Sequence, residues 1–440
     1  MFPEDLISKG VKWVFKKFKG RYVQRKQTER DVMSYEDMPL DDYEQEKTDI
    51  SPEAVKKIIL GVCIALAAGL IVFAFANKDK LTWDNISNWW TYDVLGNAGN
   101  GYPVNIVGSE VSSGNFSVNQ GHVAYASDTS FVTLNSTGSE IANIQLRYSN
   151  PAMKSSSNRY LTYGIGGTGY QIQSFDSKLY SDEAESPILA GDISTNGVYC
   201  LVTEGNGYNS TLYVFNSDNN RIYKYSFSEY YINTVAINNS GTGCIACGVT
   251  TINGVVKTGV YVLDFTKEEP VSKYEINDDI AFECKYLNDS RMAVVGESAS
   301  YIIKNGDEQF ITLSYEGKSL VNYCFDSDTD SFAIALSRSG DGRSCVLERY
   351  NDRGEKTCSI NTMLGADSIS VYKGTIAVLD GNKAYGYDSN GNQTFVCDTG
   401  TGSKRIILTS DSNAYVLSVN QIRYFDLKNP PSTADQANKE

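Results

Sequence analysis

The chain has 440 residues, with 39 Lys and Arg against 53 Asp and Glu, which gives a formal net charge of −14. Hydrophobic residues make up 41% and aromatic residues 12%, enough for a large core, so disorder of the whole chain is excluded. Residues 1–30 carry nine Lys and Arg against three acids, and residues 31–57 carry nine acids against three Lys. The net charges of these two segments cancel, so the rest of the chain carries the whole net charge of −14. This acidity argues against nucleic-acid binding, because phosphate affinity needs a basic surface.

Residues 1–57 are expected to form a cytoplasmic segment. In the first 25 residues apolar side chains fall on one helical stripe and lysines on the opposite face, which is typical of a helix lying on anionic lipid. The residues expected to contact the membrane surface are Ile7, Lys9, Val11, Lys12, Val14, Phe15, Lys16, Phe18 and Lys19. A solvated helix or a partner-binding helix is the alternative. The acidic residues 31–57 are expected to be a disordered tether.

Residues 58–76 are nineteen consecutive residues without a charge. As a helix with a rise of ~1.5 Å per residue they cover roughly 28 Å, about one hydrocarbon core, so we predict a transmembrane helix. A cleaved signal peptide is the rival, because Ala74-Phe75-Ala76 resembles a cleavage site, but 57 residues precede the run. We therefore expect an uncleaved signal anchor in a bacterial-type cell membrane, with the basic N-terminus cytoplasmic and everything after the span outside.

Residues 77–103 are expected to be an extracytoplasmic linker. It holds three of the four tryptophans, Trp83, Trp89 and Trp90. Tryptophans this close to a span commonly lie at the level of the lipid headgroups, and packing beneath the following domain is an equal alternative. A run rich in Gly and Asn at residues 96–101 marks the end of the linker.

From Val104 onward the sequence predicts short strands separated by turn residues. Apolar segments recur about every 40 residues, at 122–126, 160–163, 198–202, 244–247, 292–295, 332–336, 375–379 and 414–417. In each unit a strand and a polar turn precede this segment, and a Tyr- and Val-rich strand, a second turn and an outer strand follow it. Gly and Asn occupy the turns because hairpins need residues that tolerate positive φ. A period near 40 with four strands per unit predicts β-propeller blades.

The strand–turn–strand phrases at Ile193–Tyr199 and Phe325–Ala335 resemble those of TolB-like and WD-repeat propellers, although no blade ends in Trp-Asp. The chain is also similar to a family of uncharacterised, membrane-anchored bacterial propellers. We predict an all-β, eight-bladed propeller over residues 104–428, with seven blades as the alternative and residues 429–440 as a disordered tail. The last unit lacks an outer strand, which residues 104–107 are expected to supply, so closing the ring.

Nine cysteines give no metal pattern. Cys244 and Cys247 are three residues apart on one expected strand, so they point to opposite faces and are expected to pack in the core. Cys345 and Cys358 flank an apparent hairpin at Arg353-Gly354, where either a disulfide or two buried free thiols fit the pattern.

The sequence predicts no catalytic, cofactor-binding or metal site. His122 is the only histidine and begins a strand, so we expect it to be structural, and histidine triads and multi-histidine metal sites are excluded. Asp326, Asp328 and Asp330 resemble a calcium loop, but Ser331 stands where such a loop needs glycine, so a turn is favoured.

The function most consistent with these features is a non-enzymatic binding scaffold. The propeller would hold an envelope protein or polymer while the span ties it to membrane lipid; blades rich in Tyr, Asn and Ser suit adaptable recognition. One alternative is an extracellular hydrolase or lyase that uses carboxylates in the central channel. The other is a transmembrane sensor that signals through the N-terminal segment.

Overall fold

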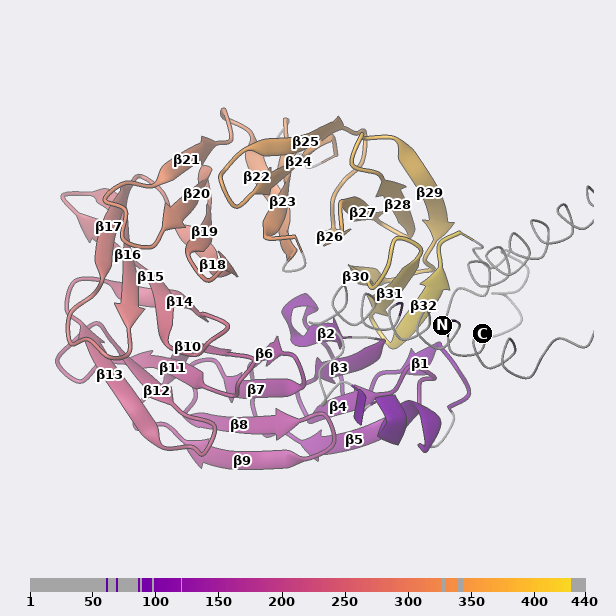
Figure 1. The fold of residues 1–440 in the computed structure, drawn as a ribbon, viewed down its shortest axis with the longest axis horizontal. Coiled ribbons are helices and arrows are strands. Elements are labelled where there is room, and N and C mark those ends of the chain that lie inside the picture. Colours follow the sequence, from indigo (N-terminus) through magenta and orange to yellow (C-terminus); the bar gives the residue numbers. More distant parts are fainter. Residues whose placement is uncertain are drawn as a thin grey trace, which may run out of the picture. The chain divides into compact units, whose positions relative to one another are not determined.

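The computed structural model describes Gly61, Gly69 and residues 86–87, 89–96, 99–119, 121–326, 329–338 and 343–428. The chain divides into a unit of Met1–Leu81 and a unit of Thr82–Glu440. In the described part of the second unit, 32 strands form eight four-stranded antiparallel sheets arranged in a ring (Figure 1). This is an eight-bladed β-propeller, so the prediction of eight blades is confirmed and the seven-bladed alternative is wrong.

Each blade has four strands in order from the channel outward. The innermost strands are β2 (Phe116–Asn119), β6 (Pro151–Ser156), β10 (Ile188–Ile193), β14 (Tyr231–Ile237), β18 (Ala281–Asn288), β22 (Ser319–Asp326), β26 (Ser368–Tyr372) and β30 (Ser403–Leu408). The second strands are β3 (His122–Ala126), β7 (Arg159–Gly164), β11 (Tyr199–Glu204), β15 (Gly243–Ile252), β19 (Arg291–Gly296), β23 (Ser331–Ser337), β27 (Thr375–Asp380) and β31 (Asn413–Ser418).

The third strands are β4 (Ser130–Leu134), β8 (Gly169–Ser174), β12 (Ser210–Phe215), β16 (Val255–Asp264), β20 (Ala299–Lys304), β24 (Cys345–Asn351), β28 (Lys383–Tyr387) and β32 (Gln421–Asp426). The outermost strands are β5 (Glu140–Gln145), β9 (Lys178–Glu183), β13 (Arg221–Phe227), β17 (Ser272–Asn277), β21 (Ile311–Ser314), β25 (Lys356–Asn361), β29 (Gln393–Asp398) and β1 (Val104–Asn105). Two short helical segments, η1 (Trp89–Val94) and η2 (Ser113–Asn115), precede blade 1.

The recurring apolar segments of the sequence are the second strands of the blades. These strands are almost entirely buried, whereas an outermost strand such as β25 alternates between exposed and buried positions over residues 357–361. A second strand is covered on both faces by neighbouring blades, so both of its faces favour apolar side chains. An outermost strand has one wetter face, which explains its period of two.

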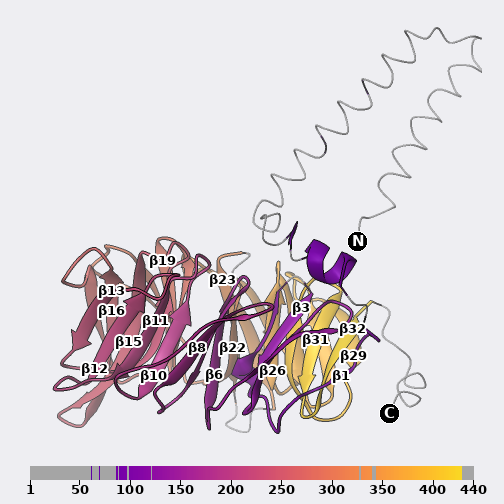
Figure 2. The same cartoon turned by 90° about the horizontal axis from the view of Figure 1, so that it is seen from below.

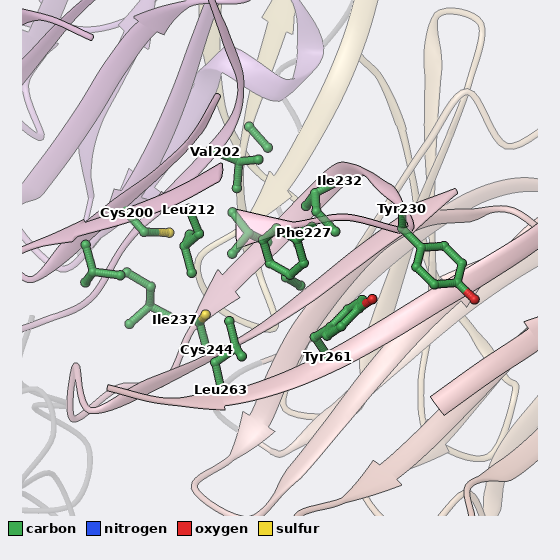
Figure 3. Packing of buried hydrophobic residues seen from close by; sticks show 14 of the residues in the cluster. Cys200, Val202, Leu212, Phe227, Tyr230, Ile232, Ile237, Cys244, Tyr261 and Leu263 are labelled. Atoms are coloured by element: carbon green, nitrogen blue, oxygen red, sulfur yellow. The ribbon is translucent and has the colours of Figure 1, made fainter. Parts of the chain in front are cut away.

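The hydrophobic core lies between blades. The cluster in Figure 3 combines Cys200 and Leu212 of blade 3 with Cys244 and Tyr261 of blade 4. Cys247, three residues after Cys244, packs instead into the next cluster, between blades 4 and 5. The prediction that these two thiols point to opposite faces of one strand is therefore confirmed.

The bridge considered between Cys345 and Cys358 does not fit the hairpin of blade 6. Cys358 pairs with Arg349, four residues along β24 from Cys345, and both cysteines are buried. Four residues of strand span about 13 Å, well beyond the Cα separation that a disulfide allows. Cys345 and Cys358 are therefore not joined to each other by a disulfide.

The ring is closed by the first strand of the domain. β1 pairs antiparallel with β32, Val104 opposite Ile422 and Asn105 opposite Gln421, and the N–H of Ile106 donates to the carbonyl of Asn420 over 2.9 Å. Blade 8 therefore takes its outermost strand from the start of the domain and its other three from the end. The predicted closure is confirmed, and it removes the exposed edge that β32 would otherwise present.

The innermost strands present an unpaired backbone edge to the channel, and side chains of the preceding blade bond to much of it. Asn115 donates to the carbonyl of Pro151 (2.7 Å) and accepts from the N–H of Met153 (2.9 Å). Asp192 accepts from the N–H of Ile237 at 2.9 Å. Further contacts of this kind are Asn233 to Ala281, Asn322 to Asp367, Ser368 to Ile406, Ser370 to Leu408 and Arg405 to Ser113. These contacts fix the register between blades.

The predicted transmembrane helix at 58–76 lies outside the described residues, apart from Gly61 and Gly69. No helix within the described ranges has both the length and the apolar character needed to cross a bilayer. The predicted membrane-surface residues Ile7–Lys19, the acidic tether and the tail also lie outside them.

The closure can be tested by an engineered disulfide. Asn105 and Gln421 form a directly opposed pair flanked by hydrogen-bonded pairs, where Cα atoms lie about 4.5 Å apart. We expect the variant Asn105→Cys/Gln421→Cys to crosslink on oxidation and to gain about 2–4 kcal/mol in free energy of unfolding, lost again on reduction. Denaturant unfolding with and without reductant measures the gain. Asn105→Cys/Gln393→Cys is the matched control, and equal crosslinking in both variants would contradict the closure.

Candidate functional site

The chain direction gives the disc two different faces. The innermost strands all start on one face, where the turns after the second strands and the connections between blades also lie. The turns after the first and third strands lie on the opposite face. η1 is bound to that opposite face at blade 1, seen at the top of Figure 2. We call the face that carries η1 the linker face, and the other the cavity face.

A cavity of about 350 Å³ opens on the cavity face, among the first residues of the innermost strands of blades 2 to 5. Its polar lining residues are Ser112, Asn115, Asn150, Lys154, Tyr163, Asn233, Thr234 and Glu283. Its apolar lining includes Phe282 and Ile165, whose side chains are more than a third exposed. The size and the mixture of apolar walls with a few polar groups are typical of ligand sites.

An ion pair crosses the cavity. The Lys154 ammonium of blade 2 lies 3.5 Å from Glu283 Oε1 of blade 5, and both side chains are about one-third exposed. Burial lowers the pKa of Lys154, but the carboxylates of Glu283 and Asp192 outweigh it, so the pKa is raised and the amine stays charged. A partly exposed pair of this kind adds little stability and is free to exchange partners with a ligand.

Glu283 also faces groups from blades 6 and 8. Burial and the Glu283 carboxylate raise the pKa of Tyr323, so this phenol stays protonated and can donate. Burial lowers the pKa of Arg405, and Glu283 opposes that shift. Burial also raises the pKa of Cys324 to about 12, with Asp326 adding to the shift. Lys154 and Arg405 thus both lie near the Glu283 carboxylate, and Asp192 adds a second carboxylate near Lys154.

The hydrolase alternative expected paired carboxylates in the channel. Glu283 is the single carboxylate among the residues that line this cavity. The nearby carboxylate of Asp192 is buried and accepts the N–H of Ile237. Glycoside hydrolysis by the usual pair needs one carboxylate as acid and a second as base or nucleophile, and the lining of this cavity supplies one of them.

Large exposed hydrophobic side chains gather on the cavity face. Those in its turns, in the connections between blades and at the strand ends on this face are Val107, Ile165, Tyr208, Tyr231, Ile252, Val255, Phe282, Val321, Met363 and Val419. On the linker face, Leu179, Ile222 and Ile311 are exposed at the starts of outermost strands, and Trp89, Trp90, Val94 and Leu95 are exposed in and just after η1. Aromatic residues and Met are enriched in protein interfaces, and within the propeller Tyr208, Tyr231, Phe282 and Met363 expose such side chains on the cavity face, which suits this face for recognition.

His122 has the structural role that the sequence predicted. Its Nε2 lies 2.6 Å from Asp93 Oδ2 of η1, and both side chains are nearly buried. Sequence reasoning missed this partner, because Asp93 lies in the presumed linker. Trp89 and Trp90 are 53% and 52% exposed, so they do not pack beneath the propeller, and Trp83 lies outside the described residues.

The carboxylates at 326–330 form a turn where the structure describes them. The N–H of Thr329 donates to the carbonyl of Asp326, and the Asp326 carboxylate is buried beside Thr329 and Arg349. Asp328 lies outside the described residues. Within the described ranges, no group of three or more His, Cys, Asp or Glu side chains is placed to hold a metal ion.

Residues 102–424 match the model of a family of unknown function, DUF5711. The chain belongs to this family. No curated protein matches it. The DUF5711 chain resembles a crystal structure of the eukaryotic initiation factor, with a TM-score of 0.51, 12% identity, and coverage of 76% of this chain and 88% of the other. At that identity the likeness shows the propeller fold alone.

Two further solved structures are similar. Apo AztD from Citrobacter koseri has a TM-score of 0.47 and 9% identity, covering 67% of this chain and 88% of that one. Hsv2 from Kluyvelomyces marxianus has a TM-score of 0.43 and 9% identity, covering 61% and 90%.

The raised pKa of Cys324 predicts its reactivity. With a pKa of about 12, its thiolate fraction at pH 8 is on the order of 10⁻⁴. We expect alkylation of Cys324 in the folded protein to accelerate about tenfold per pH unit from pH 7 to 10. The same cysteine in urea-unfolded chain should level off near pH 9, close to its ordinary pKa. Residue-resolved mass spectrometry with iodoacetamide measures both rates. A plateau below pH 9.5 in the folded protein would contradict the burial that raises the pKa of Cys324.

Proposed function

We propose that this DUF5711 chain is a membrane-anchored, extracytoplasmic binding module that holds a protein partner on the cavity face of its propeller. The observation that carries the proposal is that the cavity and the exposed side chains of Tyr208, Tyr231, Phe282 and Met363 lie on one face, opposite η1. The anchoring is supported by the nineteen uncharged residues at 58–76 and by the acidic remainder of the chain.

The contact would combine two elements. Tyr231 and Phe282 are 59% and 46% exposed and can bury their rings against a partner. A polar or acidic side chain of the partner would enter the cavity and meet Lys154, displacing part of its ion pair with Glu283. A rigid ring loses little conformational entropy on binding, which favours recognition by a preformed surface.

Site-specific photocrosslinking in cells that express the full chain tests this proposal. A photoreactive phenylalanine analogue at Tyr231 or Phe282 samples the cavity face, and the same residue at the exposed Asp218 or Ser389 samples the linker face. We expect one discrete protein adduct from both cavity-face positions and none from the controls. Phe282→Asp with Lys154→Met should reduce the adduct from position 231 at least tenfold, since the ring and the charge are both lost.

Two outcomes would contradict the proposal. Adducts of equal yield from both faces, or none from the cavity face, would remove the recognition surface. If glycan-degrading enzymes digest the adduct, the partner is an envelope polymer and not a protein.

A further inference from the structure

η1 is held rigidly against blade 1 on one side. Asp93 accepts from the N–H and the hydroxyl of Ser136, at 3.2 and 2.5 Å, in addition to its contact with His122. The carbonyl of Tyr92 accepts from the Asn135 side chain at 3.1 Å. We call these contacts of Tyr92 and Asp93 the clamp.

The Tyr92 ring completes the clamp. It packs against Phe175, with ring centroids 5.6 Å apart. Burial and a hydrogen bond to Asp176 raise the pKa of Tyr92, and the same bond lowers the pKa of Asp176. Contacts to three turns, in blades 1 and 2, thus tie η1 to the disc.

The other side of η1 is apolar and uncovered. Trp89, Trp90, Val94 and Leu95 are between 44% and 69% exposed. The two tryptophan rings lie side by side, with centroids 6.2 Å apart. Leu95 closes a wide turn, in which its N–H donates to the carbonyl of Trp90 at 2.9 Å. We call the surface of these four residues the seat.

The chain's own sequence indicates what covers the seat. Trp89 comes 13 positions after Ala76, the end of the predicted span, so at most about 45 Å of extended chain separates the seat from the predicted hydrocarbon core. Tryptophan favours the headgroup level of a bilayer, because its ring is apolar and its N–H still finds water or lipid oxygens. A held, exposed apolar cluster at this distance from a span fits a lipid surface.

We propose that the seat rests in the headgroup region of the bilayer and that the clamp thereby orients the disc. The linker face then lies toward the lipid, and the cavity face points away from it. The inference rests on the proposed membrane anchoring and adds an orientation, which a span joined by a free linker would not supply.

Brominated lipid tests the seat directly. The propeller at 104–428 contains no tryptophan, so Trp13→Phe with Trp83→Phe leaves Trp89 and Trp90 as the whole signal. The full chain with these changes is reconstituted into phosphatidylcholine–phosphatidylglycerol vesicles, with or without bromine on the upper acyl chain. We expect bromine to quench at least about half of the tryptophan emission, because the rings lie at headgroup depth.

Flotation and quenching together distinguish a failure of the seat from a failure of the membrane anchoring on which it rests. A chain that floats with the vesicles but shows no quenching keeps the anchoring and overturns the seat. A chain that does not float overturns both. If a second copy of the chain or another protein covers the seat instead, the tryptophan emission would stay unquenched and would shift with protein concentration.

The orientation has its own measurement. Ser389 and Asn382 are exposed residues of blade 7, on the linker and cavity faces respectively. A donor dye on Ser389→Cys should transfer more energy to a lipid-borne acceptor than one on Asn382→Cys, with wild-type chain as the labelling blank. Asp93→Ala should reduce this difference in energy transfer at least twofold and leave the tryptophan quenching unchanged, because it breaks the clamp and not the seat. Equal transfer from both faces in the unaltered clamp would overturn the orientation.

Discussion

The unpaired inner edge of each blade is the constraint on which this structure depends. A β-sheet edge that faces a channel leaves N–H and C=O groups without strand partners, and burying them unbonded costs free energy. Here side chains from the preceding blade bond to these backbone groups. Asn115 does so for Pro151 and Met153, and Asp192 does so for Ile237. Each bond ties the register of one blade to the next. The innermost strands are therefore held in register, and two of them bring Lys154 and Glu283 together at the cavity.

The same strand order separates two tasks onto two faces. Every innermost strand starts on the cavity face, so first residues from blades 2 to 5 meet around one cavity. The turns that receive η1 lie on the opposite face, where Asp93 meets His122. The closing strand β1 follows η1 within ten residues, so ring closure and attachment of the linker involve one short stretch of chain. A partner on the cavity face and a lipid surface at η1 would not compete for the same residues.

Much of the fold could be predicted, because it rests on local patterns that recur. The eight buried segments marked the second strand of every blade, and the missing last strand identified β1. The hairpin of Cys345 was misjudged although the signal was present: Cys345 lies eight residues before Arg353, and Cys358 only four after Gly354. The cavity could not be predicted, since Lys154 and Glu283 are 129 residues apart and meet only across the closed ring. The sequence period does suggest which turns share a face, and comparing them could have shown that Tyr208, Phe282 and Met363 lie on the same face.

Hydrogen exchange at the inner edges tests the central claim most directly. The amides of Met153, Ile237, Ile406 and Leu408 have side-chain acceptors from the preceding blade and no strand partner on that side. Residue-resolved exchange on the full chain should find these four amides protected to within about tenfold of amides paired between strands. Exchange as fast as that of the turn amides would mean that these bonds do not join the blades. The claim that they hold the innermost strands in register around the cavity would then be wrong.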